Sequence, residues 1–420
     1  MGIEVRPLGV LCNIACQYCY QQPQRDTGNV STRYDLEAIK RAVLQYGTSF
    51  IVFGGEPLLV PLADLEELWK WGYDKFGRNG VQTNGTLISS EHIRLFKQYH
   101  VQVGISIDGP GPLNDARWAG SLLRTRELTS RVEDVIELLC RERVSTSIII
   151  TLHRCNATPD HLPQLHDWLR HLDNIGVSSC RLHVLEVDNS CVADKYALST
   201  EENLTALLSF VPLERTLKRM TIDVFGDLRS MLLAQDDAAT CVWKACDPYT
   251  TDAVQGIEGF GVRSNCGRTN KDGIDYVKAD EAGFERYIAL YQTPQAKGGC
   301  QGCRFFLMCK GQCPGTALDG DWRNKTEHCD LWMRLYEHIE NRLLAEGKRP
   351  ISLDPNLGYL EINMIDAWKA GVNPSLSDML KTMRAADPCG KPSNPASTGQ
   401  NRPVPRPQIV KSSPETIEDS

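Results

Sequence analysis

The sequence predicts an α/β protein, in which a partial barrel of six strand–helix units precedes a cysteine-rich segment with little regular structure. Over roughly the first 220 residues, short apolar runs alternate with amphipathic helical stretches, a pattern typical of parallel strands joined by right-handed crossovers. From about residue 233 this periodicity fades, and eight of the 16 cysteines lie between Cys241 and Cys329. Such a segment cannot build a sizeable hydrophobic core, so we expect bound metal to help it fold.

Each element of the barrel rests on its own apolar pattern. Strands are expected at 3–8, 50–53, 81–83, 101–107, 147–152 and 180–186, where short apolar runs occur. Helices are expected at 35–46, 63–75, 90–99, 131–143, 160–172 and after residue 201, where apolar residues recur at helical spacing. Six units are too few for a closed eight-unit barrel. In such folds the chemistry lies at the carboxyl ends of the strands, so the loops that follow the strands should meet on one rim.

Composition excludes several classes of function. The 420 residues carry a net charge of −7 and no basic run, which argues against general nucleic-acid binding. The apolar runs are too short to span a bilayer, and the first residues contain no secretory apolar segment, so we expect a cytoplasmic protein without a membrane partner. In a reducing compartment, clustered cysteines indicate metal ligands rather than disulfides.

Changes in composition and periodicity along the chain predict four parts. We expect the barrel over 1–220, the cysteine-rich domain over 221–345, a helical extension over 346–387 and a disordered tail over 388–420. The tail contains seven prolines, many Ser, Asn and Gly residues, and no aromatic residue. A segment of this composition buries too little apolar surface to fold.

Three cysteines near the start of the chain, Cys12, Cys16 and Cys19, carry the strongest chemical signal. Their C-x3-C-x2-C spacing supplies three thiolates, whereas a [4Fe-4S] cluster normally binds four. One iron would remain open to a ligand that is not protein. Taken alone, the triplet also suits a zinc knuckle or plain buried thiols.

The second strand ends in Gly54-Gly55-Glu56-Pro57, about 35 residues after the cysteine triplet. Together the two motifs resemble the radical S-adenosylmethionine (SAM) superfamily. The resemblance implies that the open iron chelates the amino and carboxylate groups of the SAM methionine, and that the GGEP motif contacts the amino group. Reductive cleavage of SAM would then release a 5'-deoxyadenosyl radical, which the protein orients and shields from water.

The loops after the third and fourth strands, TNG and S-x-D-G-P, also match this superfamily. The resemblance places five further residues in the SAM site: Tyr18, Asn84, Ser106, Asp108 and Leu185, the last through its backbone at the adenine. Arg117 is the nearest match to an arginine that reaches the SAM carboxylate in the sulfatase-maturase branch. It lies one residue short of the usual spacing, and the alternative is a surface arginine.

The second group of cysteines has a compound spacing, C-x14-G-x4-C followed by C-x2-C-x5-C-x3-C and a final cysteine. This pattern resembles the SPASM domain, an auxiliary-cluster extension of radical SAM enzymes that act on peptides and proteins; a zinc ribbon is the alternative for a C-x2-C pair. The resemblance implies two fully ligated auxiliary [4Fe-4S] clusters, and therefore three clusters in all. Their ligands would be Cys241, Cys246, Cys266 and Cys313 for the first, and Cys300, Cys303, Cys309 and Cys329 for the second.

The function that this resemblance favours is peptide maturation by an oxidoreductase. The radical would abstract hydrogen from a residue of a ribosomally made precursor, which would then form an intramolecular cyclophane C–C or C–O link or a thioether. A sulfatase-type maturase that produces formylglycine is one alternative, but that branch has an aspartate where this chain has Gly267. A radical dehydrogenase of small alcohols and a non-enzymatic electron carrier are the others; the first has a shorter auxiliary region, and the second needs no open iron.

The expected partners are the precursor peptide and a reductant such as flavodoxin or ferredoxin. Only eleven residues precede Cys12, so we expect leader recognition by a separate protein or by another surface of this chain. The general base cannot be assigned from the sequence. Three acidic residues of the auxiliary segment are candidates: Asp272, Asp275 and Asp321.

Overall fold

The computed structural model describes residues 3–26, 28, 30, 32–251, 253–269, 279 and 281–386. The chain divides into two units, Met1–Leu380 and Lys381–Ser420. Of the second unit, the described part is the end of one helix, α14 (Leu376–Ala386). The domain limits that the sequence suggests near residues 220, 345 and 387 remain a proposal.

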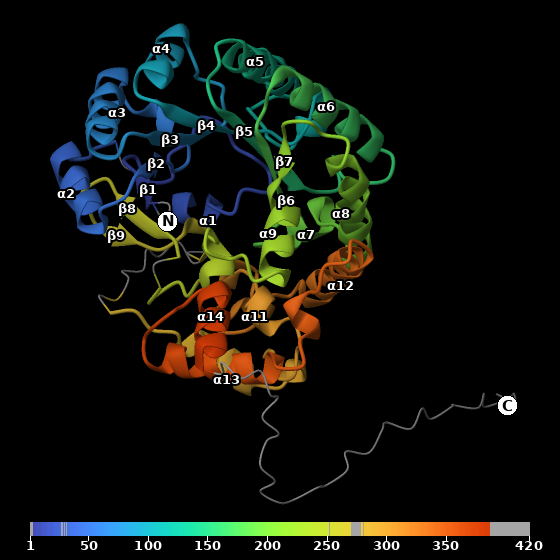
Figure 1. The fold of residues 1–420 in the computed structure, drawn as a ribbon. Helices are drawn as coiled ribbons and strands as arrows, with labels where there is room; N and C mark the ends of the chain where they lie inside the picture. The colour runs from blue at the N-terminus through green and yellow to red at the C-terminus, as the bar shows by residue number, and fades with distance from the viewer. Residues whose placement is uncertain are drawn as a thin grey trace, which may run out of the picture. The chain divides into compact units, whose positions relative to one another are not determined.

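The first unit is built on one nine-stranded sheet with the order β7-β6-β5-β4-β3-β2-β1-β8-β9, which curves into an open barrel (Figure 1). All neighbouring strands are parallel except β8 and β9, which are antiparallel. The strands are β1 (Ile3–Arg6), β2 (Phe50–Val52), β3 (Asn79–Thr83), β4 (Val101–Ser106), β5 (Thr146–Leu152), β6 (Ser179–Val184), β7 (Thr221–Ile222), β8 (Gln255–Glu258) and β9 (Arg263–Ser264). The first six follow one another across the sheet, which confirms the predicted partial barrel.

Helices cover the outer side of this sheet (Figure 1). They are α2 (Leu36–Tyr46), α3 (Leu62–Phe76), α4 (Ser90–Gln98), α5 (Leu122–Arg141), α6 (Leu162–Ile175) and α8 (Thr200–Glu214). Local capping explains two of their starts: the side chains of Asp35 and Ser121 accept hydrogen bonds from the first turns of α2 and α5. Helix α5 begins nine residues before the predicted start, because its first turns bury Thr125 and Thr129 rather than apolar residues.

The remaining helices lie in connections and in the later part of the chain. They are α1 (Gln22–Asp26), α7 (Ser190–Tyr196), α9 (Asp223–Leu232), α10 (Glu285–Gln292), α11 (Phe306–Cys309), α12 (Cys329–Ala345) and α13 (Leu357–Lys369). The cysteine-rich segment has more core than its weak periodicity suggests. Tyr287 and Phe306 are buried against Trp368 of α13, with ring centroids 5.3 Å and 6.0 Å away. Three aromatic side chains bury enough apolar area to compensate for the missing aliphatic pattern.

The cysteine-rich segment also extends the barrel sheet, since β8 pairs with the free edge of β1. Arg6, at the end of β1, is buried and forms an ion pair with Glu258 of β8 at 2.6 Å. The same guanidinium donates to the carbonyl of Asn265 at 2.7 Å. A buried cation is tolerated only with such partners, so Arg6 fixes the cysteine-rich segment against the rim where the cysteine triplet begins.

Candidate functional site

The carboxyl ends of the barrel strands and the cysteine-rich segment enclose a cavity of about 260 Å³. Its wall combines predicted residues from both halves of the chain. Those are Cys12, Cys16, Tyr18, Cys19, Gly54, Gly55, Asn84, Ser106, Arg117, Leu185, Cys241 and Cys266. Glu56, Pro57 and Asp108 are buried near this wall and are not part of its lining. The predicted convergence of the loops on one rim therefore matches the structure.

The cysteine loop is held in place by its backbone. Ala15 N–H donates to Trp118 C=O at 2.8 Å, and Gln17 N–H donates to Ala116 C=O at 2.9 Å. Burial raises the pKa of the Cys16 thiol to about 12, because a thiolate loses hydration in the cavity. Bound iron reverses this preference by stabilising thiolates. Three thiols facing one cavity are a donor set that fits three corners of an iron–sulfur cluster.

Gly54 and Gly55 allow the GGEP loop to pack directly on the cysteine loop. A Cβ at Gly55 would lie 2.3 Å from the carbonyl oxygens of Val10 and Leu11, and Gly54 has a φ of +136°. Glu56 N–H donates to Leu11 C=O at 2.8 Å. The missing side chains thus face the chain itself. Contact between two loops, rather than close approach of a ligand alone, requires glycine here.

Glu56 joins the GGEP loop to the TNG loop from a buried position. Its carboxylate accepts hydrogen bonds from Thr83 Oγ1 at 2.6 Å, Asn84 N–H at 2.8 Å and Leu58 N–H at 3.0 Å. Burial raises the pKa of Glu56, while these hydrogen bonds act in the opposite direction. The carboxylate positions Asn84, whose Nδ2 donates to Asn13 Oδ1 of the cysteine loop at 2.8 Å.

Asp108 is the centre of a buried polar network beside the cavity. Its carboxylate accepts a hydrogen bond from Tyr18 Oη and one from Thr151 N–H at 3.1 Å, and lies 3.3 Å from His153 Nε2. Burial acts to raise the pKa of Asp108, but Arg117, His153 and Tyr18 together outweigh it and hold that pKa below its usual value. The carboxylate is therefore ionised and balances the positive charge of Arg117.

Arg117 lines the cavity with 13% of its side chain exposed, unlike a free surface arginine. Its Nη1 donates to Tyr18 Oη at 3.1 Å and lies 3.8 Å from Asp108. Ser106 is also fixed, since its hydroxyl accepts a hydrogen bond from Gln82 Nε2 at 2.9 Å. Both side chains are therefore positioned to receive a ligand with an anionic group.

The eight cysteines of the second group, from Cys241 to Cys329, lie in two separate parts of the structure. Cys241 and Cys313 line a cavity of about 110 Å³ next to the main one, and Cys241 and Cys266 face the main cavity. Cys246, the fourth ligand expected there, lines neither cavity, and its carbonyl accepts a hydrogen bond from Tyr287 at 2.8 Å.

The other four cysteines lie around one small apolar cavity beneath Phe305 and Tyr336: Cys300, Cys303, Cys309 and Cys329. This is the set that the SPASM resemblance assigns to one cluster, and its four thiols suit full ligation. Within the described residues, no three His, Cys, Asp or Glu side chains are close enough to bind a single metal ion directly. A cluster places several irons between its thiolates and therefore takes cysteines that lie farther apart.

The sequence did not predict one charged pair on the cavity wall. Arg268, two residues after Cys266, forms an ion pair with Glu186 at 2.6 Å and lies 2.8 Å from His183 Nδ1. Burial and the neighbouring Arg268 and Arg181 hold the pKa of His183 well below its usual value, so the ring is neutral and accepts the hydrogen bond. The signal in the sequence was a glutamate two residues after the end of β6, where residues of a barrel active site lie.

Of the three base candidates from the sequence, Asp321 is described by the structure, and it does not lie on this wall. Asp321 forms an ion pair with Arg323 at 2.6 Å and is not part of the cavity lining. Asp272 and Asp275 lie outside the described residues.

A comparison with known families gives a match to part of the barrel. Residues 7–169 match the family described as the radical SAM superfamily. These residues carry the cysteine triplet and the GGEP, TNG and S-x-D-G-P loops around the cavity. Residues 7–169 form a radical SAM domain.

Curated relatives of this chain include sulfatase-maturating enzymes. The serine-type enzyme of Klebsiella aerogenes is 27% identical over 213 residues, which cover 47% of this chain and 50% of that enzyme. The chain thus spans 30% to 51% of the length of the serine-type enzymes that it matches. The cysteine-type enzyme of Clostridium perfringens strain 13 is 24% identical over 383 residues, covering 82% of this chain and 97% of that enzyme.

Solved structures extend the likeness in fold beyond the radical SAM domain. A structure described as native anSMEcpe with bound AdoMet and Kp18Cys peptide covers 82% of this chain and 98% of its own, with a TM-score of 0.64 and 19% identity. Streptococcus suis SuiB bound to precursor peptide SuiA covers 78% of this chain and 75% of its own, with a TM-score of 0.50 and 13% identity. Both matches cover more of the chain than residues 7–169. Among the described residues, no helix is long and apolar enough to cross a membrane.

Proposed function

We propose that this protein is a radical SAM maturase that oxidises a residue of a peptide substrate. The observation that carries the proposal is the shared cavity, whose wall holds Cys12, Cys16 and Cys19 on the barrel side, and Cys241 and Cys266 on the other side. A residue bound between the two sets of thiols would lie between the site of radical formation and an acceptor of the surplus electron. The relatives and solved structures named above support a substrate of this class.

The residues on the wall fit SAM and its cluster. The cluster bound by the triplet would supply the electron that cleaves SAM. Arg117 would pair with the SAM carboxylate, and Ser106 and Asn84 would hydrogen-bond to its polar groups. The buried Asp108 would keep Arg117 in place. Leu185, buried on the same wall, would exclude water beside the adenine.

The product that we propose is an intramolecular cross-link of the C–C, C–O or thioether type. The substrate would give one hydrogen atom to the radical that SAM supplies, and the resulting substrate radical would attack a second group of the same peptide. Cys241, Cys246, Cys266 and Cys313 would hold an oxidised iron–sulfur cluster able to accept the remaining electron, and a base would take the proton. Glu186 is the carboxylate that we assign to this proton, because it lies on the cavity wall at the end of β6.

Formylglycine formation is the second candidate, since the curated relatives include serine- and cysteine-type sulfatase-maturating enzymes. Gly267 argues against it, because glycine cannot take the proton that the aspartate of that branch is expected to take. Cross-linking and the conversion of serine to formylglycine both remove two hydrogen atoms from the peptide, so the mass change does not separate them. Only formylglycine is an aldehyde.

The test is anaerobic reconstitution followed by turnover. The purified protein is loaded with iron and sulfide, reduced in the presence of SAM, and incubated with peptides encoded near its gene. We expect 5'-deoxyadenosine and a peptide that has lost two hydrogen atoms and does not react with a hydrazide probe. A hydrazide-reactive product would favour formylglycine, and a protein that forms no 5'-deoxyadenosine would contradict both candidates. Iron and sulfide for one cluster only would contradict the three-cluster assignment.

A further inference from the structure

A second pocket lies at the opposite end of the barrel from the cysteine-lined cavity. It is about 440 Å³ in volume and is formed by the end of α8, the loop that leads into β7, Arg229 of α9 and the last turns of α12. This loop precedes β7, whereas the loops of the main cavity follow their strands. The pocket is therefore separate from the proposed catalytic site.

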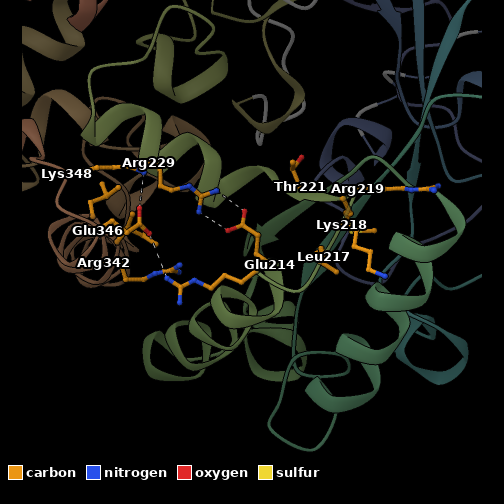
Figure 2. A pocket seen from close by; sticks show the side chains of 13 residues that line it. Glu214, Leu217, Lys218, Arg219, Thr221, Arg229, Arg342, Glu346 and Lys348 are labelled. Atoms are coloured by element: carbon orange, nitrogen blue, oxygen red, sulfur yellow. Dashed lines mark hydrogen bonds and ion pairs between the residues drawn. The ribbon is translucent and has the colours of Figure 1, made fainter.

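Charge distinguishes this pocket from the rest of an acidic chain. Six cationic residues and only two carboxylates line it. Figure 2 shows Lys218 and Arg219 leading away from Glu214 and Arg229, so these two cations contribute little to its centre. The four that remain are Arg215, Arg229, Arg342 and Lys348.

Both carboxylates of the pocket are already engaged. Glu214 accepts two hydrogen bonds from Arg229, at 2.8 Å and 3.0 Å, drawn as dashed lines in Figure 2. Glu346 pairs with Lys348 at 2.9 Å and lies 3.9 Å from Arg215. These contacts leave positive charge in excess around Arg342.

Arg342 is the residue that indicates a ligand. Its Nη1 atom is buried, and no hydrogen-bond partner is found for it among the described residues. Burial, Arg215 and Arg229 lower the pKa of Arg342, which shows that the surroundings disfavour its charge. The side chain as a whole is only part-buried, so an oxyanion in the pocket would meet the outer part of the guanidinium and would offset the crowded positive charge.

The floor of the pocket is apolar. Met220, Ile339 and Leu343 line it, and all three side chains are buried. A cationic rim over an apolar floor suits a ligand that joins a carboxylate to an apolar body. In a peptide, an acidic residue beside a leucine or a similar side chain has this chemistry.

We propose that this pocket binds an acidic–apolar segment of the peptide substrate, with its carboxylate on Arg342. The inference rests on the proposed function, which supplies the peptide. Strand β5, the longest of the described sheet, has seven residues and therefore spans about 23 Å from one end of the barrel towards the other, at about 3.3 Å per residue. About seven extended residues cover that distance, so at least roughly that many separate the bound segment from the residue that is modified.

Binding is measured on the full chain without SAM or reductant. The probe is a fluorescein-labelled octapeptide of alternating Glu and Leu. The control peptide has the same label and length, with Gln in place of each Glu. We expect the Glu peptide to bind, to weaken as salt rises, and to be displaced by excess inorganic phosphate. Arg342→Gln should weaken binding by about tenfold or more, as expected for a lost charge-assisted hydrogen bond.

Arg334→Gln is the matched control, because Arg334 lies on the same helix and pairs with Glu201 outside the pocket. It should leave binding unchanged. Arg342→Gln should not lower the melting temperature, since it removes a crowded charge; a purely structural arginine would lower it. Equal binding of the Gln peptide, equal loss in both variants, or a pocket that binds phosphate but not the Glu peptide would overturn the proposal. If the Glu peptide binds as expected but no peptide is modified in the turnover assay, the proposed function is contradicted and the binding pocket is not.

Discussion

At the scale of single residues, the cavity depends on a few buried charges that neutralise one another. Asp108 is fully buried, and its partners come from the cysteine loop, from β5 and its following loop, and from Arg117. Removing one member of such a group leaves the others buried without a counter-charge. The network is therefore a point at which one substitution should affect both stability and ligand binding.

Asp108→Asn should lower the free energy of unfolding by about 3 kcal/mol, because Arg117 and His153 lose the carboxylate that balances them. The lowered pKa of Asp108 stabilises the native state above the ordinary aspartate pKa of about 4, and this contribution is lost as pH falls through the native pKa. Denaturant titrations at several pH values should show a smaller acid-induced loss in the variant. Asp321→Asn removes a surface ion pair and should cost less than about 1 kcal/mol. Equal effects of the two variants would contradict the assigned role.

Glu186→Gln should slow formation of the oxidised peptide by about a hundredfold, because an amide cannot take the proton that leaves the substrate. Formation of 5'-deoxyadenosine should continue, so mass spectrometry should find uncoupled cleavage of SAM. Glu4→Gln is the comparison, since Glu4 lines the same cavity. If Glu4→Gln uncouples the reaction and Glu186→Gln does not, the proton belongs to Glu4.

At the scale of elements, the fit between two loops sets the geometry of the rim. The GGEP loop after β2 and the cysteine loop after β1 touch through backbone atoms, with no space for a side chain at Gly55. Glu56 then connects the GGEP loop to the TNG loop after β3. Three consecutive strand ends therefore carry one continuous polar framework around the cysteine triplet.

Gly55→Ala should disrupt this framework, because its Cβ would lie 2.3 Å from two carbonyl oxygens and the loops would have to separate. We expect the iron content of the reconstituted protein to fall by about one cluster, measured together with the visible absorption of the cluster. Gly358→Ala is the control: it lies in α13 with no atom within 4 Å of the added Cβ. That change should leave the iron content unaltered and increase stability by about 0.5–1 kcal/mol. Normal iron content in Gly55→Ala would contradict the packing argument.

An element could be predicted from the sequence when its own residues carry an apolar run or a short motif. The first six strands and the loops after them follow from apolar runs and short motifs, and the structure has them in the predicted order. The two-residue strands β7 and β9, and β8 with its glycine, have no such run; β8 is a strand because the edge of β1 needs a partner. The Arg268–Glu186 pair joins residues 82 positions apart in the sequence, and no spacing rule connects them.

At the scale of the whole molecule, the cysteine-rich segment and the barrel share one sheet. β1 has β2 on one side and β8 on the other, and Arg6 joins β1 to β8 through Glu258. The cavity is likewise lined from both segments. The barrel and the cysteine-rich segment therefore stabilise each other, although their sequences differ in composition and periodicity.

A chain that ends at residue 232 tests this dependence. It would leave β1 as an exposed edge strand and Arg6 buried without Glu258, so we expect aggregation rather than a soluble monomer. Size-exclusion chromatography and light scattering of the truncated and full chains would measure the difference. A monomeric truncated chain with the thermal stability of the full chain would contradict the shared-sheet argument.

The late pairing of β1 has a consequence for synthesis on the ribosome. β1 is translated first, but its second neighbour comes from Gln255–Glu258, so at about 5–20 residues per second the strand waits roughly ten to fifty seconds. During this interval the cysteine loop is not yet covered by the segment that carries Cys241 and Cys266. We expect this to be the period in which an iron–sulfur donor has the widest access to the triplet, so the order of translation itself favours loading that site before the cavity closes.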